Sequence, residues 1–218
     1  MPEPRLLLTG FGPFPGVPQN PTARIAKEFD GQAIHGLRVV GADLEVCFES
    51  IASQLESLFD KHEPAAILLL GVAVARDCIG LEGQAYNLRE AGRPDAKGRH
   101  FDTPQPLLST RSLGEALQTS IQRQDLLAEL EKAGLPVELS EDPGRYLCNA
   151  SFFHALHFPK SALQKPPSLF VHLPQVGNPI QKNSEKTWAM KDLREATRVL
   201  LKGIAAQISP QTVSSSPS

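Results

Sequence analysis

The sequence predicts an α/β fold: a three-layer α/β/α sandwich with a mostly parallel, twisted sheet and a short antiparallel excursion. Short apolar runs bounded by Gly or Pro alternate along the chain with segments of helical periodicity, and this order is typical of a parallel sheet with helices on both sides. The runs at residues 67–70 and 169–171 do not alternate with polar residues, which indicates strands covered on both faces.

Five apolar runs are expected to form strands. The strands are expected at residues 6–9, 37–46, 65–70, 137–139 and 169–173.

The first helix is expected to follow the first strand. Asn20 provides an N-cap and Pro21 stands at the first helical position, so this helix is expected to reach about Phe29.

Periodic apolar residues predict further helices. A helix-like stretch at residues 150–158 follows Cys148, and Leu127 and Leu130 lie on a helix that Gly134 ends. The other two helices show apolar faces formed by Phe48, Ile51, Leu55, Leu58 and Phe59 and, near the C-terminus, by Trp188, Leu193, Leu200, Leu201 and Ile204.

Residues 1–208 are expected to form a single α/β domain, because 218 residues suit one sizeable core. The segment 82–112 is rich in Gly, Pro, Arg and Asp, so it is expected to be a long excursion at the rim of the sheet, with short antiparallel strands in it. The tail 209–218 is rich in Ser and Pro and is expected to be disordered.

Composition and charge exclude several classes of function for this chain. The chain has 22 basic and 24 acidic side chains and a net charge of -2, so it lacks the positive excess that a nucleic-acid partner requires. The three cysteines form no close pair, the N-terminus does not resemble a secretion signal, and no apolar stretch is long enough to span a bilayer. We therefore expect a soluble, cytoplasmic protein.

Cys148 is a candidate nucleophile. It follows the turn that contains Gly144 and begins a helix-like stretch. In the first turn of a helix, unpaired backbone N–H groups and the helix dipole favour the thiolate, which is the form that attacks carbonyl carbons. A buried structural cysteine is the alternative that position alone leaves open.

A thiol nucleophile needs a base, and an imidazole suits that task near neutral pH. His172 ends an apolar strand, where sites gather in open parallel sheets, although a histidine after a strand can also be structural. His154 and His157 follow Cys148 on its own helix and lie far around it, so they are poor partners. Their spacing could serve a metal pair, but no third ligand is evident, and we expect no metal.

Glu82 can supply the carboxylate that orients such an imidazole. It follows the strand at residues 65–70 in what reads as a loop, where a single glutamate is ordinarily solvated. Phe11 and Phe14 lie in a Gly/Pro loop after the first strand and are expected to cover something apolar rather than to join the core. A phosphate cradle is the competing interpretation of this loop, but its glycine spacing fits neither the Walker nor the dinucleotide pattern.

These residues together resemble the pyroglutamyl peptidase I family, cysteine peptidases that remove N-terminal pyroglutamate. The resemblance runs from about Leu6 to Ile208. It implies an enzyme in which Cys148 is the nucleophile, His172 the general base and acid, and Glu82 the orienting carboxylate. Four segments carry it, at residues 9–14 with 20–22, 71–87, 139–149 and 170–174.

The resemblance also implies a substrate pocket, peptides with N-terminal pyroglutamate as partners, no cofactor, a cytoplasmic location and, often, a homo-oligomer. It places an arginine, here Arg76, near the oxyanion site. The residues implied in substrate binding are Phe11, Phe14, Asn20, Val72 and Tyr146.

Several residues depart from the family pattern. Val72, Val74 and Ala75 stand where the family usually has Gln and two glycines, Gly83-Gln84 follows Glu82 in place of a basic residue, and Pro143 replaces alanine. These departures leave the triad in place and bear on substrate affinity and selectivity. Two alternatives therefore stay open: a protein of this fold that binds pyroglutamyl-like ligands without turnover, and a thiol hydrolase of another small amide.

Overall fold

The computed structural model describes residues 3–14, 17–90, 94–157, 165–180 and 185–208. The expected tail 209–218 and the expected helix end at Phe158 lie outside them. In chain order the elements are β1 (Arg5–Phe11), α1 (Pro21–Phe29), β2 (Ala33–Ile34), β3 (Leu37–Leu44), α2 (Ile51–His62), β4 (Ala66–Ala73), β5 (Ile79–Glu82), β6 (Gln84–Tyr86), β7 (Ala116–Gln118), α3 (Arg123–Lys132), β8 (Val137–Ser140), α4 (Leu147–His157), β9 (Ser168–Pro174) and α5 (Met190–Ile208).

The main sheet is mixed but mostly parallel, which confirms the predicted fold class. Its strand order is β2-β3-β1-β4-β9-β5-β8. The pairs β3–β1, β1–β4, β4–β9 and β5–β8 are parallel, whereas β2–β3 and β5–β9 are antiparallel. The predicted antiparallel excursion is the pair β6–β7, whose second strand lies past the expected limit at residue 112.

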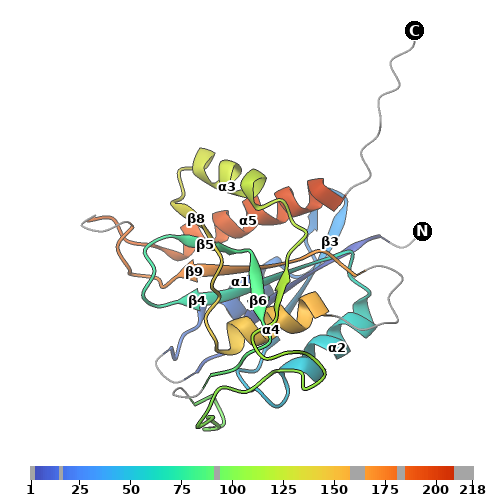
Figure 1. Cartoon of the computed structure of the whole chain (residues 1–218). Coiled ribbons are helices and arrows are strands. Elements are labelled where there is room, and N and C mark those ends of the chain that lie inside the picture. The colour runs from blue at the N-terminus through green and yellow to red at the C-terminus, as the bar shows by residue number, and fades with distance from the viewer. Residues whose placement is uncertain (1–2, 15–16, 91–93, 158–164, 181–184, 209–218) are drawn as a thin grey trace.

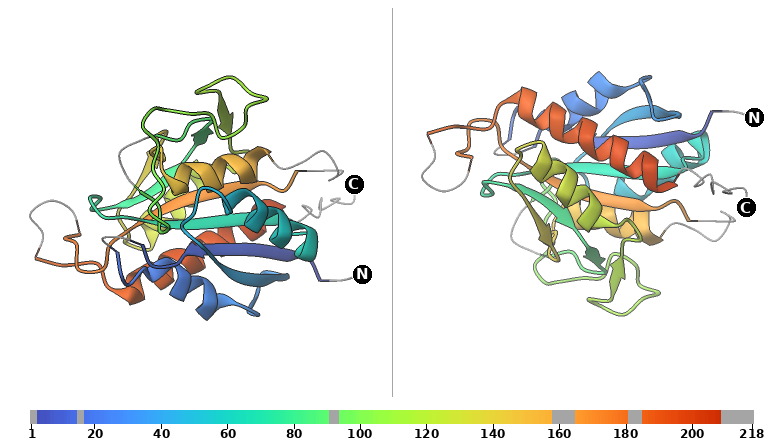
Figure 2. Two further views of the ribbon diagram at one scale, coloured as in Figure 1. Left: turned by 90° about the horizontal axis from the view of Figure 1, so that it is seen from below. Right: turned by 90° about the horizontal axis from the view of Figure 1, so that it is seen from above.

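Helices cover both faces of the sheet, as Figures 1 and 2 show. One core layer packs α1, α3 and α5 against the sheet, with Leu68, Leu169 and Val171 fully buried. The other packs α2 and α4 against the opposite face, with Leu69 and Phe170 fully buried. Residues 169 and 171 therefore face one layer and residue 170 the other, as the period of a strand requires.

The first helix shows why these elements form where they do. The Asn20 side chain accepts a hydrogen bond from the backbone N–H of Thr22 at 3.1 Å, and Pro21 opens the helix, as predicted. A Cβ at Gly10 would lie 2.2 Å from the Thr22 carbonyl carbon. A glycine in β1 is therefore required for α1 to begin directly against the end of that strand.

Three element predictions were wrong. Phe48 was placed on a helix face, but α2 begins at Ile51. Residues 79–82 were read as loop, but they form β5, a strand buried along its whole length. Trp188 was placed on the C-terminal helix face, but α5 begins at Met190. The Trp188 side chain is 1% exposed and its indole N–H donates to the Asp77 carbonyl at 2.8 Å, so its packing role is to anchor the segment before α5.

Among the helices that the structure describes, none has the length and apolar character that a membrane crossing requires.

Candidate active site

Three chemically active side chains from separate elements meet on the α4 side of the sheet. Cys148 is the second residue of α4, His172 lies on β9, and Glu82 is the last residue of β5. The Nδ1 atom of His172 lies 2.7 Å from Oε1 of Glu82. His172 is 6% exposed and Glu82 is fully buried, so the carboxylate predicted to lie in a loop is held inside the fold.

The thiol lies beside the imidazole because a neighbouring strand leaves room for it. Gly71 of β4 is in register with His172 of β9. A Cβ atom at Gly71 would lie 3.0 Å from Sγ of Cys148 and 2.6 Å from Cζ of Phe170. The position therefore has space for the sulfur only because residue 71 has no side chain.

The charges of this group favour an imidazolium. Burial opposes the charge on His172, but the charge of Cys148, its hydrogen bond to the imidazole, and Glu82 outweigh burial and raise the pKa of His172 to about 9. Burial likewise opposes the charge on Glu82, yet its contacts with His172, Ser140 and Arg76 lower its pKa. At neutral pH a protonated imidazole therefore lies between the sulfur and an ionised carboxylate.

The helix start adds to this arrangement. The first N–H groups of an α-helix have no intrahelical acceptor, and they carry the positive end of the helix dipole. With Cys148 in the first turn of α4, these N–H groups lie next to the sulfur, where a developing oxyanion would form.

Arg76 lies against the carboxylate. Its Nη1 atom is 3.0 Å from Oε1 of Glu82. Its Nη2 atom donates to the Ser140 hydroxyl at 3.1 Å and to the Asp142 carbonyl at 3.3 Å. The role implied for Arg76 near the oxyanion stays a prediction, and the contacts that it makes here are with the protein.

A pocket of about 390 Å³ opens onto this group. Phe14 and Tyr146 stand in its wall with ring centroids 6.3 Å apart, and the Tyr146 hydroxyl donates to the Pro94 carbonyl at 2.8 Å. The lining residues are Phe14, Val72, Ala73, Val74, Ala75, Arg76, Asp142, Pro143, Gly144, Tyr146, Cys148 and His172. Four of the residues predicted to contact substrate or oxyanion thus share a pocket with the thiol and the imidazole.

Phe11 and Asn20, also predicted to bind substrate, have other surroundings. Phe11 is 3% exposed and packs in the core layer of α2 and α4, so the expectation that it stays out of the core is wrong. Asn20 caps α1 and donates to the Gly12 carbonyl at 3.3 Å. Neither residue is part of the pocket lining given above.

Sequence reasoning missed Asn149, which holds the nucleophile's helix in place. This residue is fully buried. Its Oδ1 accepts from the Tyr86 N–H at 2.7 Å, and its Nδ2 donates to the carbonyls of Tyr86 and Leu88 at 2.8 and 2.7 Å. An amide next to the cysteine in a mostly apolar helix was the available signal, because such a buried amide needs partners.

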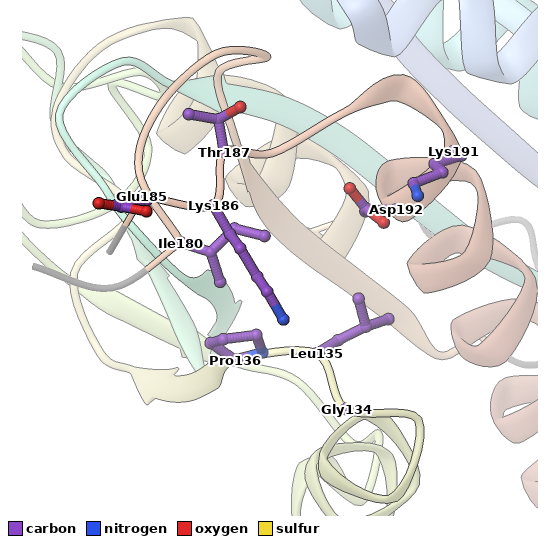
Figure 3. Close-up of a pocket in the computed structure, with 9 residues that line it drawn as sticks. All are labelled: Gly134, Leu135, Pro136, Ile180, Glu185, Lys186, Thr187, Lys191 and Asp192. Atoms are coloured by element: carbon purple, nitrogen blue, oxygen red, sulfur yellow. The ribbon is translucent and has the colours of Figure 1, made fainter. Parts of the chain in front are cut away.

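A larger pocket of about 1040 Å³ lies elsewhere, between the turn before β8, the segment that leads to α5, and the start of α5. In Figure 3 the Lys186 side chain extends toward Pro136 and Leu135. Its described lining contains neither cysteine nor histidine, so it lacks the nucleophile and the base that line the smaller pocket. Among the described residues, no group of three His, Cys, Asp or Glu side chains is placed to hold a metal ion.

The chain is similar to known proteins along most of its length. Residues 4–209 match the model of the pyroglutamyl peptidase family. The pyrrolidone-carboxylate peptidase of Oceanobacillus iheyensis is 31% identical, with 90% of this chain and 97% of that protein covered. That of Deinococcus radiodurans is 30% identical, with 94% and 96% covered.

Solved structures agree with the sequence comparisons. The crystal structure of pyrrolidone carboxyl peptidase from Thermus thermophilus superimposes with a TM-score of 0.79 at 30% identity, covering 91% of this chain and 99% of that one. A mutant of the Pyrococcus furiosus enzyme gives 0.85 at 27% identity, with 94% and 99% covered. The chain therefore belongs to the pyroglutamyl peptidase family of cysteine peptidases, as its sequence motifs predicted.

Proposed function

We propose that this chain hydrolyses the amide bond after an N-terminal pyroglutamyl residue through a thioester, with Cys148 as nucleophile, His172 as general base and acid, and Glu82 as the group that orients the imidazole. Family membership supports the reaction. The observation that carries the residue roles is the position of His172, whose imidazole lies 2.7 Å from Glu82 and lines the same pocket as Cys148.

In the acylation step, the Cys148 sulfur attacks the carbonyl carbon that joins pyroglutamate to the next residue. The carbonyl electrons move onto oxygen, and backbone N–H groups in the first turn of α4 stabilise that oxyanion. When the tetrahedral species collapses, the C–N bond breaks and His172 gives its proton to the departing amine. A thioester and a free peptide amine result.

In the deacylation step, neutral His172 takes a proton from water as the oxygen attacks the thioester carbon. The C–S bond then breaks, the sulfur leaves as thiolate, and free pyroglutamate is released. Glu82 stabilises the imidazolium in both halves of the cycle. Each oxyanion donor is worth on the order of 3 kcal/mol in the transition state.

Selectivity follows from the apolar wall of the pocket. Phe14, Val72 and Tyr146 offer contact surface for a neutral ring. An ordinary peptide N-terminus carries an ammonium group, and its burial against such surface without a partner is costly. A cyclised, uncharged N-terminal residue avoids that cost.

The test is release of a fluorophore from a pyroglutamyl amide. Cys148→Ala and Cys148→Ser should abolish it while circular dichroism stays unchanged, and His172→Ala should nearly match that loss because members of a triad act as a unit. Cys78→Ala is the matched control and should retain activity, since burial and the charge of Glu138 raise the pKa of the Cys78 thiol to about 11. Unchanged turnover in Cys148→Ala would refute the assignment.

The same assay separates the alternatives. Ligand binding without turnover would give no release from any aminoacyl amide, together with a Cys148 that iodoacetamide modifies only in the ordinary thiol range. A hydrolase of another small amide would turn over a different member of the panel.

We also infer a cytoplasmic enzyme that forms a homo-oligomer and needs no cofactor for these steps. The three cysteines, all described, are free thiols, as expected in a reducing compartment. Light scattering of the purified chain tests the oligomeric state.

A further inference from the structure

The position beside His172 on β5 has no side chain of its own. Strands β5 and β9 are antiparallel, and Gly80 lies directly opposite His172, while Glu82 lies opposite Phe170. Directly opposed residues point to the same face of a sheet, and diagonal neighbours remain within reach of long side chains. Glu82 therefore reaches His172 diagonally, across the space that Gly80 leaves empty.

The guanidinium of Arg76 fills that space. A Cβ atom at Gly80 would lie 1.8 Å from Nη1 of Arg76 and 3.0 Å from its Cζ. The same nitrogen lies 3.0 Å from Oε1 of Glu82, the oxygen that also faces Nδ1 of His172 at 2.7 Å. A single carboxylate oxygen is thus shared by the imidazole and the guanidinium.

The other contacts of Arg76 fix its orientation. Nη2 bonds Ser140 and the Asp142 carbonyl, both in the chain that leads from β8 to the nucleophile's helix. Glu138 lies 3.7 Å from Nη1, but it is half exposed and thus well screened. The Arg76 side chain is 24% exposed, so the planar guanidinium is held from both edges between β5 and the end of β8.

The proposed mechanism needs the positive charge of Arg76 after His172 has lost its proton. While His172 is protonated, the imidazolium balances the fully buried Glu82 carboxylate. Once His172 has given its proton to the leaving amine, the imidazole is neutral, and an unpaired buried carboxylate would hold that proton back. The guanidinium of Arg76, which contacts Glu82, supplies a positive charge at that moment.

We propose that Arg76 is a positioning residue of the triad: its guanidinium, seated over Gly80, fixes the Glu82 carboxylate and balances its charge so that His172 can release and recover its proton. The role of Arg76 in peptide hydrolysis rests on the proposed function. Its effect on the Cys148–His172 pair does not, and that effect can be measured without a peptide substrate.

The direction of the pH effect follows from the charges that face this group. They are Cys148 on α4, His172 on β9, Glu82 on β5, and Glu138, Cys78 and Asp142 around the guanidinium. Loss of a fixed cation raises the pKa of each titratable neighbour, because it removes a charge that opposes protonation. The reactivity of the pair should therefore move to higher pH.

The experiment measures two pH profiles, for Cys148 alkylation by iodoacetamide followed by mass spectrometry and for kcat/KM on a pyroglutamyl amide. Arg76→Met should move the alkylation profile up by about one pH unit and lower kcat/KM at neutral pH about 10-fold or more. Arg76→Lys, which keeps the charge, should recover part of the shift. Gly80→Ala, which displaces the guanidinium without removing it, should shift the profile in the same direction.

A matched control and a double variant separate the roles that Arg76 can have. Arg123 also ties β5 to β8, through the carbonyls of Leu81 and Ser140 at 3.1 Å, but its contacts include no triad residue. Arg123→Met should therefore lower the melting temperature and leave the alkylation profile in place. In the Glu82→Gln background, adding Arg76→Met should lower kcat/KM by less than about 3-fold, because the effects of coupled residues are not additive.

Two results would overturn the proposal. One is an unshifted alkylation profile in Arg76→Met and Gly80→Ala, measured on variants whose circular dichroism shows them folded. The other is a full loss from Arg76→Met even in the Glu82→Gln background, which would assign the guanidinium to the oxyanion of the substrate. If wild type fails to cleave pyroglutamyl amides, the proposed function fails alone, and the alkylation profiles still decide the role of Arg76.

Discussion

His172 lies between two strands that both present a glycine to it, and the two glycines serve different partners. On β4, Gly71 leaves room for the sulfur of Cys148; on β5, Gly80 leaves room for the guanidinium of Arg76. The imidazole therefore has a reacting group on one side and, on the other, the carboxylate with its counter-ion. The comparison shows that an absent side chain can place a functional group as firmly as a present one.

The two sides differ in how rigidly they are built. A Cβ at Gly71 would press on Phe170, which is fully buried, and on a sulfur fixed by the start of α4. A Cβ at Gly80 would meet the far end of a flexible arginine. The nucleophile side therefore has little freedom to adjust, whereas the counter-ion side can move at small cost to stability.

Gly71→Ala should give the largest effect among changes that keep all three triad residues. Either the Phe170 ring or the Cys148 sulfur must move, so we expect about 1 to 3 kcal/mol of lost stability from overpacking and about 100-fold lower kcat/KM from a misplaced nucleophile. Thermal melting and fluorogenic turnover measure the two. Gly80→Ala is the natural control, and equal losses in both variants would contradict the difference in rigidity.

Glu82→Gln acts on the other side of the imidazole and should move the pH profile in the direction opposite to Arg76→Met. Burial lowers the pKa of His172, but Cys148 and, to a smaller extent, Glu82 outweigh it and raise this pKa to about 9. The imidazolium is present below that pKa and is lost as pH rises through it. Without the carboxylate the alkaline fall in kcat/KM should begin at lower pH, with about 10-fold lower activity at neutral pH. A profile that keeps its alkaline limb would remove Glu82 from the triad.

Much of this site could be predicted from local sequence. Cys148 stands at a turn before an apolar helical stretch, and His172 follows a run that does not alternate, so Cys148 could be placed at a helix start and His172 near the end of a buried strand. In the structure β9 continues past His172 to Pro174. The five apolar runs likewise correspond to strands of the main sheet. These features depend on residues close together in the chain.

The rest depends on pairing between distant segments. The run 79–82 is short and contains Gly80, which weakens a strand signal, so neither β5 nor its antiparallel direction against β9 could be predicted. That direction decides that Gly80, not a side chain, lies beside His172. Phe11 was misjudged for a related reason: its burial comes from packing against remote elements that flanking residues do not reveal.

Asn149→Ala should give the smallest loss of activity per folded molecule. It tests whether the hydrogen bonds of Asn149 keep the nucleophile side of the site rigid. It leaves the Tyr86 N–H and the carbonyls of Tyr86 and Leu88 without the amide, so we expect a loss on the order of 2 to 3 kcal/mol in stability. Because the first turn of α4 is then less constrained, turnover should fall about 3- to 10-fold, within the range for a misplaced group.

Asn87→Ala is the matched control for this change. Asn87 is also fully buried, and its amide donates to the carbonyls of Leu108, Arg111 and Ser112 at 3.0 Å. Both variants should lose similar stability in urea unfolding, because each removes a buried amide with several partners. Only Asn149→Ala should also slow the alkylation of Cys148, because Asn149, unlike Asn87, directly follows Cys148 in the chain. Equal alkylation rates in the two variants would mean that the contacts of Asn149 with Tyr86 and Leu88 do not position the nucleophile.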